Sequence, residues 1–142
     1  MTSISDSRIL ITGAASGFGR LMALQMSKRG GKMVLWDINK EGLTSIKKEI
    51  ESQGNQVEIM ICDLRDREEI NSCAIEVLKS GPIDILVNNA GVVSGQKFLE
   101  LTPHQIETTF QINTLAHFWT TQSFLPAMLE QNKGHIVTIA SS

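Results

Sequence analysis

The sequence contains no tyrosine, and only two of its 142 residues are cysteine. Two thiols, at Cys62 and Cys73, are too few for a disulfide framework and indicate a reducing compartment. The simplest interpretation is that both are buried and act as small hydrophobic side chains. We therefore expect a cytoplasmic protein without disulfide bonds.

A strong excess of charge of either sign is also missing, because the net charge is -2. This balance argues against binding to nucleic acid or to an anionic membrane surface. No run of about 18 apolar residues occurs, so no membrane span is expected. The mostly polar start, MTSISDS, lacks the charged segment and long apolar stretch of a secretory signal. The three histidines lie far apart without metal-ligand spacing, and we expect no metal site.

The sequence does contain a core-forming composition and a regular alternation of patterns. Hydrophobic residues make up 42% and charged residues 20%, as in globular domains. Short apolar runs predict strands, and amphipathic runs between them predict helices. The predicted strands are 8–12, 32–37, 56–63, 83–89 and 135–141, and the predicted helices are 18–30, 39–55, 66–81 and 103–131.

Near-continuous apolar strands separated by helices indicate a parallel sheet covered on both faces. With right-handed crossovers, this order gives a doubly wound, Rossmann-type α/β fold of about five strands. Residues 1–142 are expected to form one domain, and the strand at 135–141 is expected to be buried. In the helix at 18–30, Leu21, Leu24 and Gln25 are expected to share a face, and the glycines at 30–31 to end the helix.

Ligands of such sheets bind beyond the carboxyl ends of the strands. The residues at these ends are Gly13, Asp37, Asp63, Asn89 and Ser141. They are therefore the candidate site residues of this chain.

A glycine-rich turn, TGAASGFG, follows the first predicted strand and leads directly into a helix. Gly13, Gly17 and Gly19 would allow backbone N–H groups and the helix N-terminus to face a pyrophosphate. The spacing is G-x-x-x-G-x-G, which differs from both G-x-G-x-x-G and the P-loop. The alternative is a turn that binds no ligand.

Asp37 ends the second predicted strand, where a carboxylate can accept hydrogen bonds from the ribose hydroxyls of adenosine. It would repel a 2′-phosphate, and its neighbours Ser16 and Ile38 are neutral. This pattern favours NAD over NADP, although Arg20 lies just past the loop. The alternative is a solvated carboxylate or a helix cap. Asp63 is similarly open to two interpretations: a hydrogen bond to the adenine amino group, or a cap of the next helix.

Together, TGAASGFG, CDL, NNAG, Asn113 and GHIVTIAS resemble the short-chain dehydrogenase/reductase family in order and spacing. LWDINK and the stretch from NNAGVVSG to GHIVTIAS look closest to the branch that oxidises retinoids and hydroxysteroids. The resemblance implies an oxidoreductase that moves a hydride between nicotinamide and an alcohol or carbonyl carbon. The substrate would be a small hydrophobic, retinoid- or hydroxysteroid-like alcohol or its carbonyl.

The resemblance also implies roles for individual residues. Asn113 would be the active-site asparagine and Ser141 the active-site serine, whose hydroxyl stabilises charge on the substrate oxygen. Asp37 would hold the adenosine ribose and Asp63 the adenine. The remaining residues implied in cofactor binding are Gly13, Ala15, Ser16, Gly17, Phe18, Gly19, Leu64, Asn89, Ala90 and Gly91.

The family's acid–base pair, a tyrosine and a lysine one helical turn apart, has no match in a chain without tyrosine. We therefore expect the chain to be the N-terminal part of such an enzyme, marginally stable and catalytically inert alone. The alternative is a non-catalytic NAD-binding or subunit-interaction module made by truncation.

The long helix at 103–131 is expected to begin with Thr102 as its N-cap and Pro103 in its first turn. In the family this helix commonly packs against another subunit. Its large apolar side chains are Phe110, Leu115, Phe118, Trp119 and Phe124. Because exposed apolar surface of this kind favours association, we expect a homo-oligomer formed through this helix.

Overall fold

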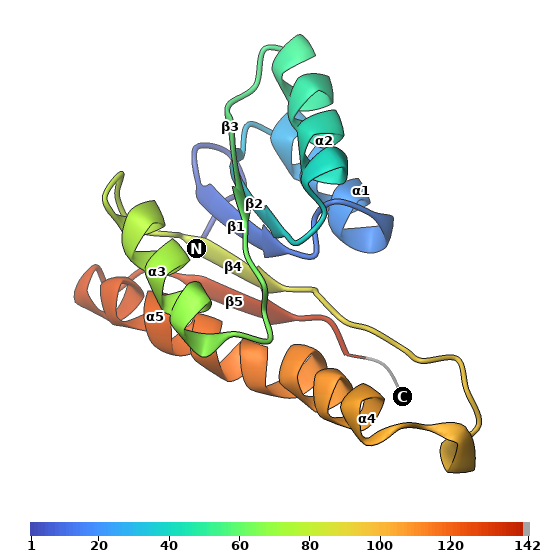
Figure 1. Ribbon diagram of the computed structural model, residues 1–142. Coiled ribbons are helices and arrows are strands. Elements are labelled where there is room, and N and C mark those ends of the chain that lie inside the picture. The colour runs from blue at the N-terminus through green and yellow to red at the C-terminus, as the bar shows by residue number, and fades with distance from the viewer. Residues whose placement is uncertain (141–142) are drawn as a thin grey trace.

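The computed structural model describes residues 1–140 and shows a parallel sheet between two layers of helices (Figure 1). The strands are β1 (Arg8–Thr12), β2 (Lys32–Asp37), β3 (Val57–Ile61), β4 (Ile85–Asn88) and β5 (His135–Thr138). The helices are α1 (Gly17–Lys28), α2 (Lys40–Ser52), α3 (Arg67–Leu78), η1 (Phe98–Glu100), α4 (Pro103–Phe110), η2 (Gln111–Leu115) and α5 (Ala116–Glu130). All the predicted strands and helices are present, with ends that differ by a few residues.

The strands lie in the order β3-β2-β1-β4-β5, and every neighbouring pair is parallel. The chain first builds the sheet outward from β1 to β3 and then returns to add β4 on the other side of β1. This reversal opens a crevice at the carboxyl ends of β1 and β4, where such folds bind ligands. The predicted doubly wound fold is therefore confirmed.

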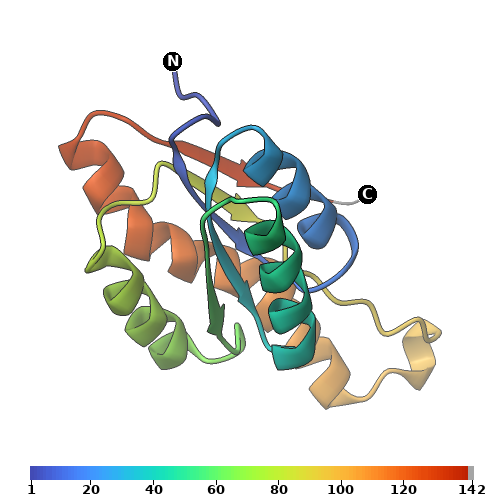
Figure 2. The same ribbon diagram turned by 90° about the horizontal axis from the view of Figure 1, so that it is seen from above.

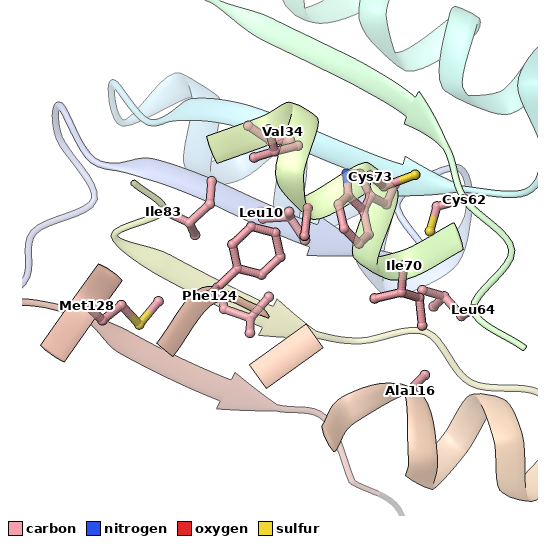
Figure 3. Packing of buried hydrophobic residues seen from close by; sticks show 14 residues of the cluster. Leu10, Val34, Cys62, Leu64, Ile70, Cys73, Ile83, Ala116, Phe124 and Met128 are labelled. Carbon is pink, nitrogen blue, oxygen red and sulfur yellow. The ribbon is translucent and has the colours of Figure 1, made fainter. Parts of the chain in front are cut away.

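Alternating side chains of the central strands bury into two separate cores. Ile9 and Ile11 of β1 pack toward α1 and α2, whereas Leu10 packs toward α3 and α5. The turned view places α1 and α2 on one side of the sheet and α3 and α5 on the other (Figure 2). Figure 3 shows the second core, where Phe124 of α5 lies 5.7 Å from the ring of Trp36 in β2.

The residues that α1 buries against the sheet are small. Its buried residues are Gly19, Ala23 and Ser27, whereas Leu21 is 53% exposed. Small side chains face the sheet because the helix lies very close to it, and larger residues could not fit there. The predicted end of the helix is confirmed, since Gly30 follows the C-cap with a φ of 86°.

The prediction that the last strand is buried is wrong for the chain described by residues 1–140. β5 is the final strand in the sheet order and, within residues 1–140, pairs only with β4. Three of its four residues are exposed, including Ile136. An apolar run is consistent with burial, but only the position of the strand at an edge decides how much of it is covered.

The long predicted helix is confirmed, with one irregularity. α4, a π-helical turn and α5 follow one another without a break from Pro103 to Glu130. Thr102 caps the start, and its hydroxyl and the Gln105 side chain form a reciprocal capping box. The π turn at 111–115 contains Asn113, and such turns occur frequently at functional sites.

No helix within residues 1–140 has the length and apolar character needed to cross a membrane.

Candidate functional site

A cleft of about 610 Å³ lies at the carboxyl ends of the strands. It brings together most of the residues that the sequence analysis singled out. These are Gly13, Ser16, Gly17, Phe18, Asp37, Asp63, Leu64, Asn89, Ala90 and Gly91. Ile38, Cys62, Arg65, Val92, Thr108, Ile112 and Ile139 complete the wall. The ends of the predicted strands thus give the location of the cleft. They do not predict that Thr108 and Ile112, which lie on a helix, also line it.

The glycine loop needs its glycines for two different reasons. A Cβ on Gly13, which has a φ of +67°, would lie 2.9 Å from the Cα of Ala90. A Cβ on Gly19 would collide with the Gly13 carbonyl oxygen. In contrast, a Cβ on Gly17 would have no atom within 4 Å. Gly13 and Gly19 therefore permit close packing, and Gly17 presents its backbone to the open cleft.

The N-terminus of α1 carries no side-chain cap. The N-cap residue Ser16 makes no capping hydrogen bond, and the first turn contains no acidic residue. By comparison, Asn39, Asp66 and Thr102 each cap the helix that follows them. The first N–H groups of α1 and its positive dipole end are therefore available to an anionic group in the cleft.

Asp37 holds the glycine loop to the end of β2. One carboxylate oxygen accepts the Ala15 N–H at 2.9 Å, and the other accepts the Asn39 N–H at 2.9 Å. Ala15 thus stays behind the cleft wall and contributes through its backbone. Each oxygen retains a further acceptor position, so Asp37 can hold the loop and still receive ribose hydroxyl groups.

Arg20, the basic residue that lies just past the glycine loop, is not part of the cleft wall. Its guanidinium forms an ion pair with Glu49 of α2. The residues beside Asp37 in the cleft wall, Ser16 and Ile38, are neutral. Arg20 therefore places no positive charge beside Asp37 that could bind a 2′-phosphate.

Asp63 does not cap the next helix, so that alternative is wrong. Asp66 is the N-cap of α3, and its side chain accepts the N–H groups of Glu68 and Glu69. The carboxylate of Asp63 instead binds Arg65 through side-chain and backbone hydrogen bonds. The side-chain hydrogen bond from Arg65 lowers the pKa of the Asp63 carboxyl. This carboxylate therefore stays ionised at the cleft wall.

Asn89 ties β1 and β4 together at the floor of the crevice. Its side-chain amide donates to the carbonyl oxygens of Thr12 at 3.0 Å and of Gly13 at 3.3 Å. The Thr12 hydroxyl in turn accepts the N–H groups of Asn89 and Ala90, both at 3.1 Å. The sequence analysis assigned no role to Thr12, although Thr12 is the first residue of the motif TGAASGFG.

Asn113 lies next to the cleft and is tied to its wall. Its amide oxygen accepts the Val92 N–H, and its amide nitrogen donates to the Val92 carbonyl, both at 2.8 Å. This two-point contact fixes the Asn113 side chain against Val92 of the cleft wall. Ser141, the other predicted active-site residue, lies outside the described residues.

Thr108 and Ile112 also line the cleft, a contribution that the sequence analysis missed. Both belong to the helix that starts at Pro103 and lie one turn apart. The hydroxyl oxygen of Thr108 is buried and has no hydrogen-bond partner. Among the described side chains, the Nε1 of Trp36 shares this property.

Both cysteines are free and buried, as expected. Burial raises the pKa of the thiols of Cys62 and Cys73. Raised pKa values keep these thiols protonated and poorly nucleophilic, even though Cys62 borders the cleft. Among residues 1–140, no group of three or more histidine, cysteine or acidic side chains could hold a metal ion.

The family model for short chain dehydrogenases matches residues 7–142. The chain belongs to the short-chain dehydrogenase family. It is 48% identical over 141 residues to human estradiol 17-beta-dehydrogenase 11 and 44% identical over 142 residues to human epidermal retinol dehydrogenase 2. These matches cover 99% of this chain but 47% and 46% of the relatives. The chain thus spans about half the length of the curated relatives that it matches.

Solved structures of the family have the same fold. A metagenomic short-chain oxidoreductase in complex with NADP gives a TM-score of 0.93 at 31% identity, covering 99% of this chain and 65% of that one. A short-chain dehydrogenase/reductase from Burkholderia phymatum in complex with NAD gives a TM-score of 0.93 at 31% identity, covering 99% and 51%. The family model and the curated relatives confirm the predicted family and its retinol and hydroxysteroid branch.

Proposed function

We propose that this chain forms the NAD-binding part of an oxidoreductase that interconverts an alcohol and its carbonyl compound. The observation that carries the proposal is the cleft, in which the uncapped start of α1, the glycine loop and Asp37 lie together. The open space beside Gly17 and the cleft volume of about 610 Å³ suit a large ligand. When bound, the dinucleotide would supply the hydride donor or acceptor.

The residues of the chain would divide the cofactor between them. Gly13, Gly17 and Gly19, with the N–H groups at the start of α1, would hold the pyrophosphate. Asp37 would receive the ribose hydroxyls of adenosine, and Asp63 the adenine amino group. The loop and wall residues that would complete the binding surface are Ala15, Ser16, Phe18, Leu64, Asn89, Ala90 and Gly91.

The preference for NAD over NADP follows from charge. A 2′-phosphate would lie against the carboxylate of Asp37, and Arg20 is occupied by Glu49. Like charges placed together at a binding interface cost several kcal/mol. The family itself uses both cofactors, as the complexes with NADP and with NAD illustrate.

The substrate class is inferred from the relatives. They are named as estradiol and retinol dehydrogenases, so we propose a hydrophobic, hydroxysteroid- or retinoid-like alcohol. Asn113 and Ser141 would be the active-site asparagine and serine. The chain contains no tyrosine to serve as acid–base group, and we therefore propose that it binds the cofactor without turning over an alcohol. The two free buried thiols support a reducing, cytoplasmic location.

A titration of the purified 142-residue chain tests the proposal. We expect NAD⁺ to bind at least about tenfold more tightly than NADP⁺ by isothermal titration calorimetry, because of the charge on Asp37. We also expect no rise in absorbance at 340 nm when retinol or estradiol is added with NAD⁺. Equal or tighter binding of NADP⁺ would overturn the cofactor preference, and binding of neither would overturn the proposal. Measurable alcohol oxidation would show that the chain is not inert.

The second proposed partner is another copy of the chain. Phe110 and Phe118 are each 62% exposed and Leu129 is 70% exposed along the helix that starts at Pro103. This helix lies along the outside of its layer, with no other helix or strand beyond it in the view of Figure 1. Of the apolar residues named for the interface, Phe124 is not available, because it is fully buried in the core.

We expect Phe118→Glu to weaken self-association of the chain by at least about tenfold, because a charge would enter an apolar interface. Sedimentation equilibrium over a range of protein concentrations measures the dissociation constant. Leu21→Glu is the matched control, since Leu21 is comparably exposed but lies on α1, on the other side of the sheet. A wild-type chain that sediments as a monomer throughout would contradict the proposal, as would equal effects of the two substitutions.

A further inference from the structure

We propose that Arg65 is a positioning residue that sets the specificity of the cleft for adenine, by fixing the carboxylate of Asp63. The inference rests on the proposed dinucleotide site and extends it to a residue that neither the motifs nor the strand-end argument single out. Both side chains line the cleft, in the turn between β3 and α3.

The first step of the argument is the number of contacts between the two residues. One carboxylate oxygen of Asp63, Oδ1, accepts the backbone N–H and the Nε–H of Arg65, both at 3.0 Å. The other, Oδ2, accepts Nη2–H of Arg65 at 2.6 Å and shares the Nε–H at 3.1 Å. A planar guanidinium that binds both oxygens fixes the orientation of a carboxylate. A single hydrogen bond does not fix this orientation.

The second step is the number of acceptor positions that remain. A carboxylate has about four lone-pair sites, two on each oxygen. The backbone N–H fills one position of Oδ1, and the shared Nε–H, counted once with the nearer oxygen Oδ1, fills the other. The Nη2–H fills one position of Oδ2. One acceptor position on Oδ2 is left, and its direction is fixed by Arg65. Asp63 thus presents a single acceptor to a ligand in the cleft.

The third step is the chemistry of the ligand. The 6-amino group of adenine is a hydrogen-bond donor and suits one fixed, charged acceptor. A 6-oxo purine such as hypoxanthine places an acceptor at the same position and would face the carboxylate without a proton between them. Arg65 should therefore matter for the choice between these bases, not only for overall affinity.

The surroundings offer little else to hold Asp63. The Asp63 N–H donates to Glu69, but the described side-chain contacts of its carboxylate are those with Arg65. Asp63 is partly exposed, with 23% of its side chain accessible. Without Arg65, the carboxylate would be free to turn toward solvent.

The test compares NAD⁺ with nicotinamide hypoxanthine dinucleotide, which has a 6-oxo group in place of the 6-amino group. Dissociation constants are measured by calorimetry on the 142-residue chain. We expect Arg65→Ala to weaken NAD⁺ binding about tenfold, as for the loss of a hydrogen bond to a charged group. Binding of the hypoxanthine dinucleotide should change little. The ratio, defined as the dissociation constant of the hypoxanthine dinucleotide divided by that of NAD⁺, should therefore fall by about the same factor. The ratio for Arg65→Lys should lie between the values for wild type and Arg65→Ala. Lysine keeps the positive charge but cannot bind both carboxylate oxygens with the planar geometry of a guanidinium.

Two further variants separate positioning from a general effect. Arg67→Ala removes the same charge two residues away, from a guanidinium that lies over the Trp119 ring and outside the cleft wall. It should leave both affinities unchanged. If Arg65 acts through Asp63, adding Arg65→Ala to Asp63→Ala should change the ratio no further.

Each outcome bears on the proposal. The proposal is supported if Arg65→Ala lowers the ratio and Arg67→Ala does not. It also requires that Arg65→Ala does not lower the ratio when Asp63 is already alanine. An unchanged ratio overturns it, whether both affinities stay the same or fall equally. Tighter NAD⁺ binding in Arg65→Ala also overturns it, because Arg65 would then compete with adenine for Asp63. If the wild-type chain binds neither dinucleotide, the proposed function fails and this inference fails with it.

Discussion

Gly19→Ala is expected to destabilise the chain by about 3 kcal/mol, the upper range for overpacking a tight site. The added Cβ would collide with the Gly13 carbonyl oxygen and lie 2.5 Å from the Asn89 side-chain nitrogen. Because Asn89 is itself bound to the carbonyl oxygens of Thr12 and Gly13, none of these atoms can move away freely. Helix α1 would have to shift away from the sheet. Urea denaturation followed by circular dichroism measures the loss.

The same substitution is expected to weaken NAD⁺ binding by about 100-fold, since a displacement of about 1 Å in a binding site can have this effect. The control is Gly54→Ala, at a glycine with a φ of +79° beyond the end of α2, where an added Cβ would have no atom within 4 Å. This variant should lose about 1 kcal/mol through its backbone conformation alone and bind NAD⁺ normally. Normal NAD⁺ affinity in Gly19→Ala would show that the start of α1 does not hold the pyrophosphate.

Asp37→Ser is expected to shift the preference between NAD⁺ and NADP⁺ by about 100-fold. Loss of charged hydrogen bonds to the ribose would weaken NAD⁺ binding about tenfold or more. Removal of the negative charge would at the same time admit the 2′-phosphate of NADP⁺. Calorimetric titration with both cofactors measures the two changes separately.

Glu41→Gln is the matched control for Asp37→Ser. It removes one exposed carboxylate from the first turn of α2, close in sequence to Asp37 but outside the cleft wall. The ratio of the two affinities should stay at the wild-type value. A ratio that moves equally in both variants would mean that net charge, not a contact of Asp37, sets the preference. A ratio that moves in neither variant would contradict the role of Asp37.

Short chain segments encode much of this fold. The apolar run at 32–37 forms β2 with the predicted ends, and the stripe of Leu43, Ile46 and Ile50 is the buried face of α2. Thr102 and Pro103 start the long helix as predicted. These features depend on periodicity and on capping, which act over a few residues and can therefore be read directly from the sequence.

The location of the site could also be predicted, because the ends of parallel strands meet at one edge of the sheet. Gly13, Asp37, Asp63 and Asn89 do line one cleft. The sequence by itself thus determined the fold class, the family and the place of the candidate cofactor site. It also assigned the residue types, since a glycine loop before a helix and a carboxylate after a strand have few other uses in this order.

Only the tertiary structure decided which surfaces are covered and which polar groups pair. The small residues of α1 face the sheet because the helix lies close to it, and β5 is exposed because, within residues 1–140, it lies at an edge. Arg65 pairs with Asp63, and Arg20 pairs with Glu49. Local sequence patterns do not specify the directions of these side chains. Thr108 of the long helix lines the same cleft as the strand ends. These outcomes depend on contacts between segments far apart in the chain, and such contacts exist only once the layers have packed.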